Sequence, residues 1–186
     1  MAVVKYNING FGQVELNNVA FRRDGRIEAQ CALSTNDFSA AAPCENGMLV
    51  AVDKANGLIK KPAASDNLPR ALVYTAEHMY DERKLGLKDF ALTPDDGLYP
   101  RVGYLSVGET FTTNCFAYDS TAYATETALN SALASCKTKA VYGVEDSSAR
   151  ICLVSALPTD AKSKFKVVAD TTMPDGQKAV KLQVIG

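Results

Sequence analysis

The residues that could act in acid–base catalysis are few in this sequence. Its one histidine, His78, lies in the stretch TAEHMYDER, with Glu77 and Asp81 close to it in the chain. A hydrolase triad would need this histidine as its base, but no Gly-x-Ser-x-Gly motif supplies an exposed nucleophile for it to activate. We therefore expect His78 to be an ordinary surface residue, and we expect the protein not to be an enzyme.

Pairs of carboxylates are the next candidates for chemistry. Asp95-Asp96 and Glu145-Asp146 are adjacent in the sequence and fall in predicted turns, where Asp favours the local backbone geometry. Two-carboxylate glycosidases instead need acids that flank the bond they cleave. The chain also lacks tryptophan, so a sugar platform would have to be built from tyrosine. These acids are expected to be solvated turn residues.

The cysteines do not indicate a disulfide framework or a metal centre. The sequence has five cysteines, an odd number, with no Cys-x-x-Cys pair and with mostly apolar neighbours: Cys31, Cys44, Cys115, Cys136 and Cys152. A zinc site would need clustered Cys and His, and the phosphate-binding loop Gly-x-x-x-x-Gly-Lys is also missing. We expect buried free thiols, no metal and no cofactor.

Charge and hydropathy argue against nucleic acid and membrane as partners. The 186 residues carry a formal net charge of −1, so no basic excess is available to follow a phosphate backbone. Phe111, Phe116 and Tyr118 lie close together but have no flanking basic residues, unlike the stacking face of a strand that binds single-stranded nucleic acid. No apolar run is long enough to span a bilayer, and the first ten residues do not resemble a signal peptide. The sequence predicts a protein made in the cytoplasm.

The stretch CENGMLVAVDKANGLIKKP is the most readable structural signal. Residues 48–52 are continuously apolar, which is typical of a strand buried on both faces. Asn56-Gly57 is a strong turn pair, and residues 58–61 return as a shorter, more polar strand. The segment predicts a β-hairpin.

The N-terminal third is predicted to be a second hairpin preceded by an arm. Apolar residues alternate in part over residues 13–21 and cleanly over residues 26–33, and Asp24-Gly25 between them is a typical hairpin turn. Residues 7–12 are rich in Asn and Gly and predict a flexible entry. We divide the chain into an arm and hairpin at 1–37 and a core domain at 38–186, with one continuous domain as the alternative.

The remaining chain predicts further short strands separated by turns. Strands are expected at 70–76, 99–105, 111–118, 140–144, 149–156, 165–169 and 178–185, with a strong turn at 93–97. Residues 121–136 predict the one short helix or helical loop, because Ala, Leu and Glu are frequent there. The fold class is therefore mainly β, a small β-barrel or β-sandwich.

Several stretches resemble bacteriophage capsid decoration (cement) proteins with small β-barrel or β-tulip domains. They are ENGMLVAVDKANGLIKKP followed by NLPRALVYTAE, then YDERKLGLKDFAL, YPRVGYLSVGETFTTNCF and MPDGQKAVKLQVI. The resemblance implies a virion structural protein on the capsid surface, with the major capsid protein as its partner and copies of itself as a second one. The alternative is a head-fibre or tail-associated module that binds a host glycan through Tyr99, Tyr104 and Tyr123.

Two groups of residues are candidates for the capsid contact under this resemblance. The first is the apolar set on the N-terminal arm, which would gain order on binding: Val3, Val4, Tyr6, Ile8 and Phe11. The second is Arg22, Arg23 and Arg26 at the tip of the predicted N-terminal hairpin, which would meet an acidic protein surface. The alternatives are that the arm completes the protein's own sheet edge as a short strand, and that the arginines are merely solvated.

Overall fold

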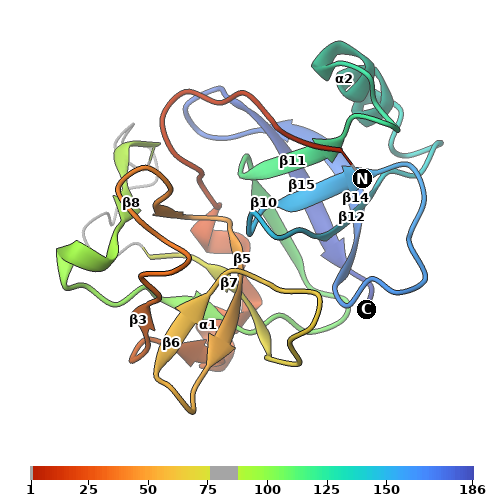
Figure 1. Cartoon of the computed structure of the whole chain (residues 1–186). Helices are drawn as coiled ribbons and strands as arrows, with labels where there is room; N and C mark the ends of the chain where they lie inside the picture. Colours follow the sequence, from red (N-terminus) through yellow and green to blue (C-terminus); the bar gives the residue numbers. More distant parts are fainter. Residues whose placement is uncertain (1, 76–87) are drawn as a thin grey trace.

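Two β-sheets facing each other make up most of the protein, whose computed structural model describes residues 2–75 and 88–186 (Figure 1). Within these residues, one sheet has the strand order β1-β11-β13-β12-β14-β15-β10, the other β2-β9-β7-β5-β6-β3, and β4 pairs with β8. The strands are β1 (Val3–Lys5), β2 (Ile27–Glu28), β3 (Ala32–Leu33), β4 (Cys44–Glu45), β5 (Leu49–Asp53), β6 (Leu58–Lys60), β7 (Arg70–Val73), β8 (Ala91–Leu92), β9 (Val102–Gly103), β10 (Thr110–Thr113), β11 (Phe116–Asp119), β12 (Tyr142–Glu145), β13 (Ile151–Val154), β14 (Lys164–Thr172) and β15 (Lys178–Val184). The predicted mainly β class is confirmed, as a β-sandwich-like fold and not as a closed barrel.

The main core lies between the two sheets, and β5 shows how the sequence builds it. Side chains alternate along a strand, so Leu49 packs into the main core with Phe165 and Leu182 of the facing sheet. Val50 and Val52 point the other way, into a second core on the outer face of their sheet. The continuously apolar stretch is therefore buried on both faces, as predicted.

The hairpin of β5 and β6 is confirmed together with its turn. Gly57 adopts a left-handed backbone (φ 64°), which glycine allows at little cost. Asp53 ends β5 and closes the turn, because its carboxylate accepts from the backbone N–H of Asn56 (3.1 Å) and from Nζ of Lys60 (2.6 Å). The hydrogen bond from Lys60 is the chief reason why the pKa of Asp53 is lowered to about 2.

The expected N-terminal hairpin is not formed. Residues Leu16–Asn18 are a 3-10 helix and Ala20–Asp24 are helix α1, so Gly25 ends a helix instead of turning a hairpin. Its backbone is left-handed (φ 69°), and its N–H donates to the carbonyl of Phe21. The apolar residues Leu16, Val19 and Phe21 are all buried here, because a spacing of two to three residues also suits short helical turns.

The expected strand at 26–33 is split into β2 and β3. The carboxylate of Glu28 accepts from the backbone N–H groups of Ala29 (3.0 Å) and Gln30 (2.8 Å), which turns the chain between the two strands. Ile27 then packs against the main core, whereas Leu33 enters the second core. Residues 1–37 thus supply strands to both sheets, since β1 pairs with β11, β2 with β9 and β3 with β6.

The expected strand at 111–118 is also two strands. β10 ends at Thr113, and β11 begins at Phe116 in a distant position of the same sheet. The break is held by side chains, because Oδ1 of Asn114 accepts from the backbone N–H of Gln13 (2.7 Å) and Oγ1 of Thr113 donates to the Gln13 carbonyl (2.6 Å). Residues that alternate in sequence thereby serve two separate strands.

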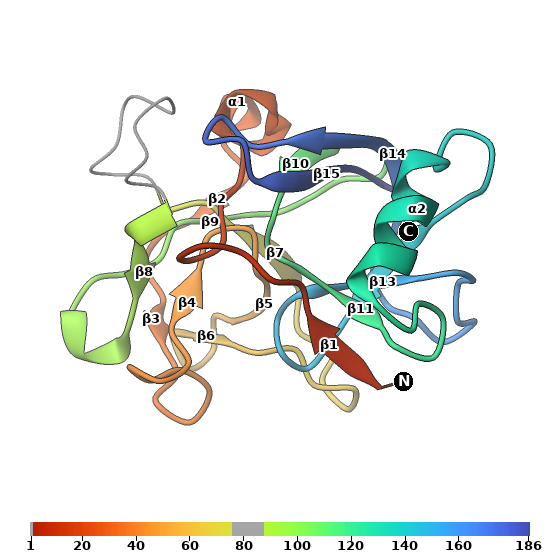
Figure 2. The same ribbon diagram turned by 90° about the horizontal axis from the view of Figure 1, so that it is seen from above.

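The C-terminal half follows the predictions closely. Helix α2 (Glu126–Ala134) begins after Thr125, whose side chain accepts from the N–H of Ala128 and caps the helix. It lies beside β14 at one end of the sheet and buries Leu129 and Leu133 (Figure 2). Among the described residues, no helix has the length and apolar character that a membrane span requires.

All five cysteines are buried and none is in a disulfide, as predicted. Burial raises the pKa of Cys115 and of Cys152 to about 12, so their reactive thiolate forms are scarce at neutral pH.

We expect the thermal unfolding midpoint to be the same with and without a reductant, because none of the buried cysteines is in a disulfide. A colorimetric thiol reagent should label the cysteines only after unfolding, and rapid labelling of the folded protein would contradict this result.

Candidate functional site

The N-terminal segment is not a free arm. Strand β1 pairs antiparallel with β11, and the N–H of Tyr6 continues the pairing to the carbonyl of Phe116 (3.2 Å). The ring of Tyr6 is buried with its centroid 4.5 Å from that of Phe116, and its hydroxyl donates to Oδ1 of Asn130 (3.2 Å). The flexible-arm prediction for Val3, Val4 and Tyr6 is wrong, and the alternative of a short strand at the protein's own sheet edge is confirmed.

A buried ion pair fixes the rest of this segment to the core. Glu45 and Arg150 are both buried, with Nη2 of Arg150 2.5 Å from Oε1 of Glu45. The other carboxylate oxygen accepts from the backbone N–H of Gly12 (2.7 Å), and Nζ of Lys5 lies 3.7 Å from Oε1. A Cβ at Gly12 would lie 2.6 Å from the Asn46 carbonyl oxygen, so only glycine fits this approach. Ile8 and Phe11, in the same segment, are partly buried.

The three candidate arginines differ in the contacts that their side chains make within the protein. Arg26 binds within the protein, donating to the carbonyl of Tyr104 (2.8 Å) and to the carboxylates of Asp24 (3.0 Å) and Glu109. Arg22 donates to the carbonyl of Leu16 (2.9 Å). Arg23 is exposed, and within the described part of the chain it has no recorded partner. Arg26 therefore holds the 104–109 loop onto α1, and the predicted contact surface of three arginines is reduced to its exposed members.

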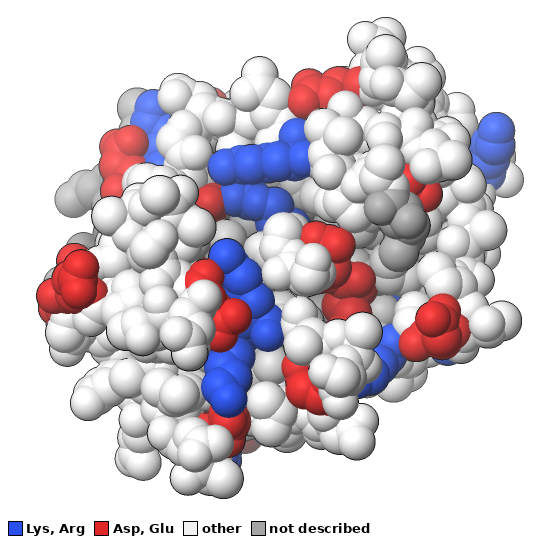
Figure 3. Space-filling model, in the orientation of Figure 1, with Lys and Arg blue, Asp and Glu red and all other residues white. Residues whose placement is uncertain are grey.

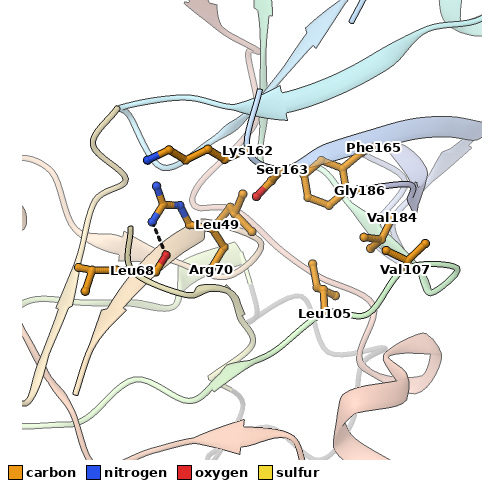
Figure 4. Close-up of a pocket in the computed structure, with 10 residues that line it drawn as sticks. All are labelled: Leu49, Leu68, Arg70, Leu105, Val107, Lys162, Ser163, Phe165, Val184 and Gly186. Atoms are coloured by element: carbon orange, nitrogen blue, oxygen red, sulfur yellow. Dashed lines mark hydrogen bonds between the residues drawn. The ribbon is translucent and has the colours of Figure 1, made fainter. Parts of the chain in front are cut away.

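An apolar cleft lies where the two sheets separate at one end of the sandwich (Figure 4). Its volume is about 310 Å³, and we call it the cleft. Leu49 and Arg70 line it from one sheet, and Phe165 and Val184 from the other. The remaining lining residues are Leu68, Leu105, Val107, Lys162, Ser163 and Gly186. Residues from five separate parts of the sequence thus form one hollow.

The rim of the cleft combines exposed apolar groups with an exposed cation. Val107 is 72% exposed, and Ile185, next to the lining residue Val184, is 36% exposed. The Arg70 charge is balanced within the protein, with Nε 2.6 Å from Glu145 and Nη1 2.5 Å from Asp66. Nζ of Lys162 donates to the backbone carbonyl of Asp66 but, among the described residues, joins no ion pair.

Asp66 is held as an anion beside the cleft. Burial opposes its ionisation, but hydrogen bonds from the Arg70 guanidinium and from the N–H groups of Ala63 and Leu68 lower its pKa below the ordinary value. The Arg70–Asp66 pair is therefore ionised at neutral pH and keeps the loop at 63–68 against the cleft wall.

A second exposed apolar feature lies on the opposite side of the molecule. The 3-10 helix η3 (Pro94–Asp96) is closed by reciprocal hydrogen bonds between Thr93 and Asp96, and Gly97 ends it with φ 64°. Leu98 and Tyr99 follow at 47% and 54% exposure. The turn at 93–97 was predicted, but its role as a rigid base for two exposed apolar side chains was not.

The acids singled out as possible catalytic residues make local contacts where the structure describes them. His78, Glu77 and Asp81 lie outside the described residues. Glu145 pairs with Arg70, and Asp146 accepts from the N–H of Ser148 (2.8 Å) within a turn.

The three tyrosines of the glycan alternative do not share one surface. Tyr99 is exposed, Tyr104 lies under Nζ of Lys54 (5.8 Å to the ring centroid), and Tyr123 is 7% exposed in the main core. Only one of the three is therefore free to stack on a sugar.

Charges of both signs are interleaved on the surface. Lys and Arg side chains gather along a hollow in the middle of the face in Figure 3, with Asp and Glu side chains beside them. Ion pairs of such opposite charges join Lys60 to Asp53 (2.6 Å) and Lys54 to Glu28 (2.8 Å). Within residues 2–75 and 88–186, no three His, Cys, Asp or Glu side chains gather as a metal site.

No protein family, curated protein or solved structure matches this chain. The exposed apolar surfaces of the chain are therefore its main indication of function. One sequence signal could have located them, because Val107 in Ser-Val-Gly and Leu98 in Gly-Leu-Tyr-Pro are apolar residues placed in turn sequences.

Proposed function

We propose that this protein is a non-enzymatic structural protein of a bacteriophage virion, which binds the outside of the capsid lattice and stabilises it. The observation that carries the proposal is that a sandwich of two sheets exposes large apolar side chains at two separate places, around Val107 and around Leu98. Exposed apolar surface that adjoins a hollow is typical of protein contact sites. The cleft with Val107 and Ile185 has this character. Leu98 and Tyr99 are exposed apolar neighbours on a second, separate turn.

A capsid lattice explains why such groups would be retained. Each of them is costly to leave in water, and packing against a neighbouring subunit removes that cost. With a formal net charge of −1 on the whole chain, attachment would depend on apolar contact more than on charge. We therefore expect binding to the major capsid protein to resist salt better than a charge-steered contact would.

The residues that we propose to contact the capsid differ from those that the sequence indicated. Residues 3–6 are engaged in the protein's own sheet and core, so they are not available to order on a partner. Val107 and Leu98 are the contact candidates instead, together with the exposed arginines Arg22 and Arg23. A capsid-surface location follows from this proposal.

The proposal is tested by mixing the purified protein with undecorated capsids and sedimenting the capsids. We expect the protein to sediment with them to a fixed number of copies per capsid, and Val107→Asp to lower this occupancy at limiting protein. Thr127→Asp, on the exposed side of α2, is the matched control and should bind normally. Failure of the wild-type protein to bind would contradict the proposal, and binding to host glycans without capsid binding would favour the fibre alternative.

A further inference from the structure

One of the two exposed apolar features is a projecting turn and the other is a hollow. We name the turn that carries Asp95, Leu98 and Tyr99 the knob. We propose that the knob of one copy of this chain inserts into the cleft of a second copy, so that copies associate head to tail. This contact goes beyond capsid binding, since it joins copies of the protein to one another and does not require a capsid.

Apolar complementarity is the first argument. Leu98 and Tyr99 stand out from the knob at about half exposure, whereas the cleft is a hollow of about 310 Å³ with mainly apolar walls. Inserting a large side chain of the knob would bury it against Phe165, Leu105 and Val184. It would also cover Val107, which is otherwise the most exposed of the large apolar residues in the described chain, so one cleft contacts either a second copy or the capsid and not both at once.

Charge complementarity is the second argument. Asp95 is exposed on the knob, and within the described residues it has no recorded partner, because Asp96 makes the capping contacts with Thr93. Lys162 is exposed at the rim of the cleft and joins no ion pair there. Within the described residues, a carboxylate with no ion pair on the knob therefore matches an ammonium with no ion pair at the cleft rim. Matched charges of this kind fix the register of an interface.

The knob and the cleft lie on different sides of the molecule, so a contact between them is head to tail and not two-fold symmetric. In Figures 1 and 2 the light-green turn that precedes residue 100 projects at the edge of the molecule away from the C-terminus, which adjoins the cleft. A copy can therefore offer its knob to one neighbour and its cleft to another. Such a heterologous contact builds a ring if the rotation closes and an open chain if it does not.

Both features are preorganised for this contact. The base of the knob is closed by the capping box of Thr93 and Asp96, and the cleft walls come from strands β5, β7, β14 and β15. A turn seated in a cleft of about 310 Å³ should bury less than the roughly 1,200 Å² of a stable interface, so we expect the contact to be weak in dilute solution. Copies held side by side on a lattice would meet at effective concentrations on the order of millimolar, which strengthens such a contact without new bonds.

Cysteine cross-linking tests the proposal in the free protein. All five native cysteines are buried, so an introduced surface cysteine reacts selectively. We mix Leu98→Cys with Val107→Cys under mild oxidation and expect mixed disulfide dimers to form several-fold faster than either variant dimerises alone. Val4→Cys replaces an exposed apolar residue elsewhere and is the matched control, so its mixture with Leu98→Cys should react slowly. Equal rates in the two mixtures would overturn the proposal, as would faster dimerisation of Leu98→Cys alone.

Charge reversal gives a second, independent measurement. Asp95→Lys and Lys162→Glu, each added to its cysteine variant, should slow the mixed cross-link several-fold, and the two together should restore it. Lys139→Glu, at an exposed position after α2, should have no effect. Failure of the double reversal to restore the rate would overturn the assigned register. Because these reactions contain no capsid, their failure leaves the sedimentation result unaffected, and a failure of capsid binding leaves them unaffected in turn.

Discussion

Replacing Arg150 by methionine is expected to lower the free energy of unfolding by about 3–5 kcal/mol, the usual cost of breaking a buried ion pair by removing one partner. Arg150→Met leaves the carboxylate of Glu45 buried without its guanidinium, 2.5 Å away in the native protein. Lys5 cannot replace it, because its ammonium lies 3.7 Å away and its side chain is half exposed. Guanidinium-induced unfolding, monitored by circular dichroism, measures the change.

Two further variants make this result specific. Arg23→Met removes an exposed arginine and should change the unfolding free energy by less than about 0.5 kcal/mol. The double variant Glu45→Leu with Arg150→Met removes both charges and should recover part of the loss. Recovery should be incomplete, because the N–H of Gly12 then has no acceptor, at a cost of about 1–3 kcal/mol. A single Arg150→Met variant as stable as the wild type would show that the pair does not hold the core.

Truncating Tyr6 to alanine should cost about 3–5 kcal/mol, as for other large buried aromatic residues. The side chain packs against Phe116 in the main core, and the change leaves a cavity behind β1. Tyr6→Phe removes only the hydrogen bond to Asn130 and should cost about 0.5–1.5 kcal/mol. Val4→Ala, at an exposed position of β1, is the control and should cost much less.

Deleting residues 1–12 extends this comparison. The truncated chain loses β1, the ring of Tyr6 and the Gly12 donor to Glu45, so we expect it not to reach the native fold. A truncated protein that unfolds at the wild-type midpoint would mean that the segment is a free arm after all.

Local signals were sufficient where neighbours in sequence determine the structure. The hairpin of β5 and β6 was predictable because Asp53 and Gly57 build its turn from within five residues. Helix α2 was predictable because Thr125 caps it and its leucines lie four residues apart, on one face. The Pro-Asp-Gly stretch at 174–176 is another local turn signal, and it lies between β14 and β15, which pair along most of their length.

The features that could not be predicted from the sequence depend on contacts between residues far apart in the chain. The break between β10 and β11 depends on Asn114 and Thr113 binding Gln13, about a hundred residues away in the chain. Gly25 suits a hairpin turn and a helix end equally well, and the burial of Phe21 under Gly103 favours the helix. The cleft combines Leu49, Val107 and Phe165, whose proximity no local pattern contains.

The most direct test of the proposed function is the temperature at which undecorated capsids come apart, measured with and without the saturating amount of this protein. Light scattering during a slow temperature ramp follows the loss of intact shells. A protein that cements the lattice binds intact shells and not dispersed subunits, so it must raise this temperature, by linkage. We predict a clear increase with the wild-type protein and a smaller one with Val107→Asp at the same total concentration. An unchanged temperature with capsids shown to be fully occupied would contradict the claim that the protein stabilises the capsid.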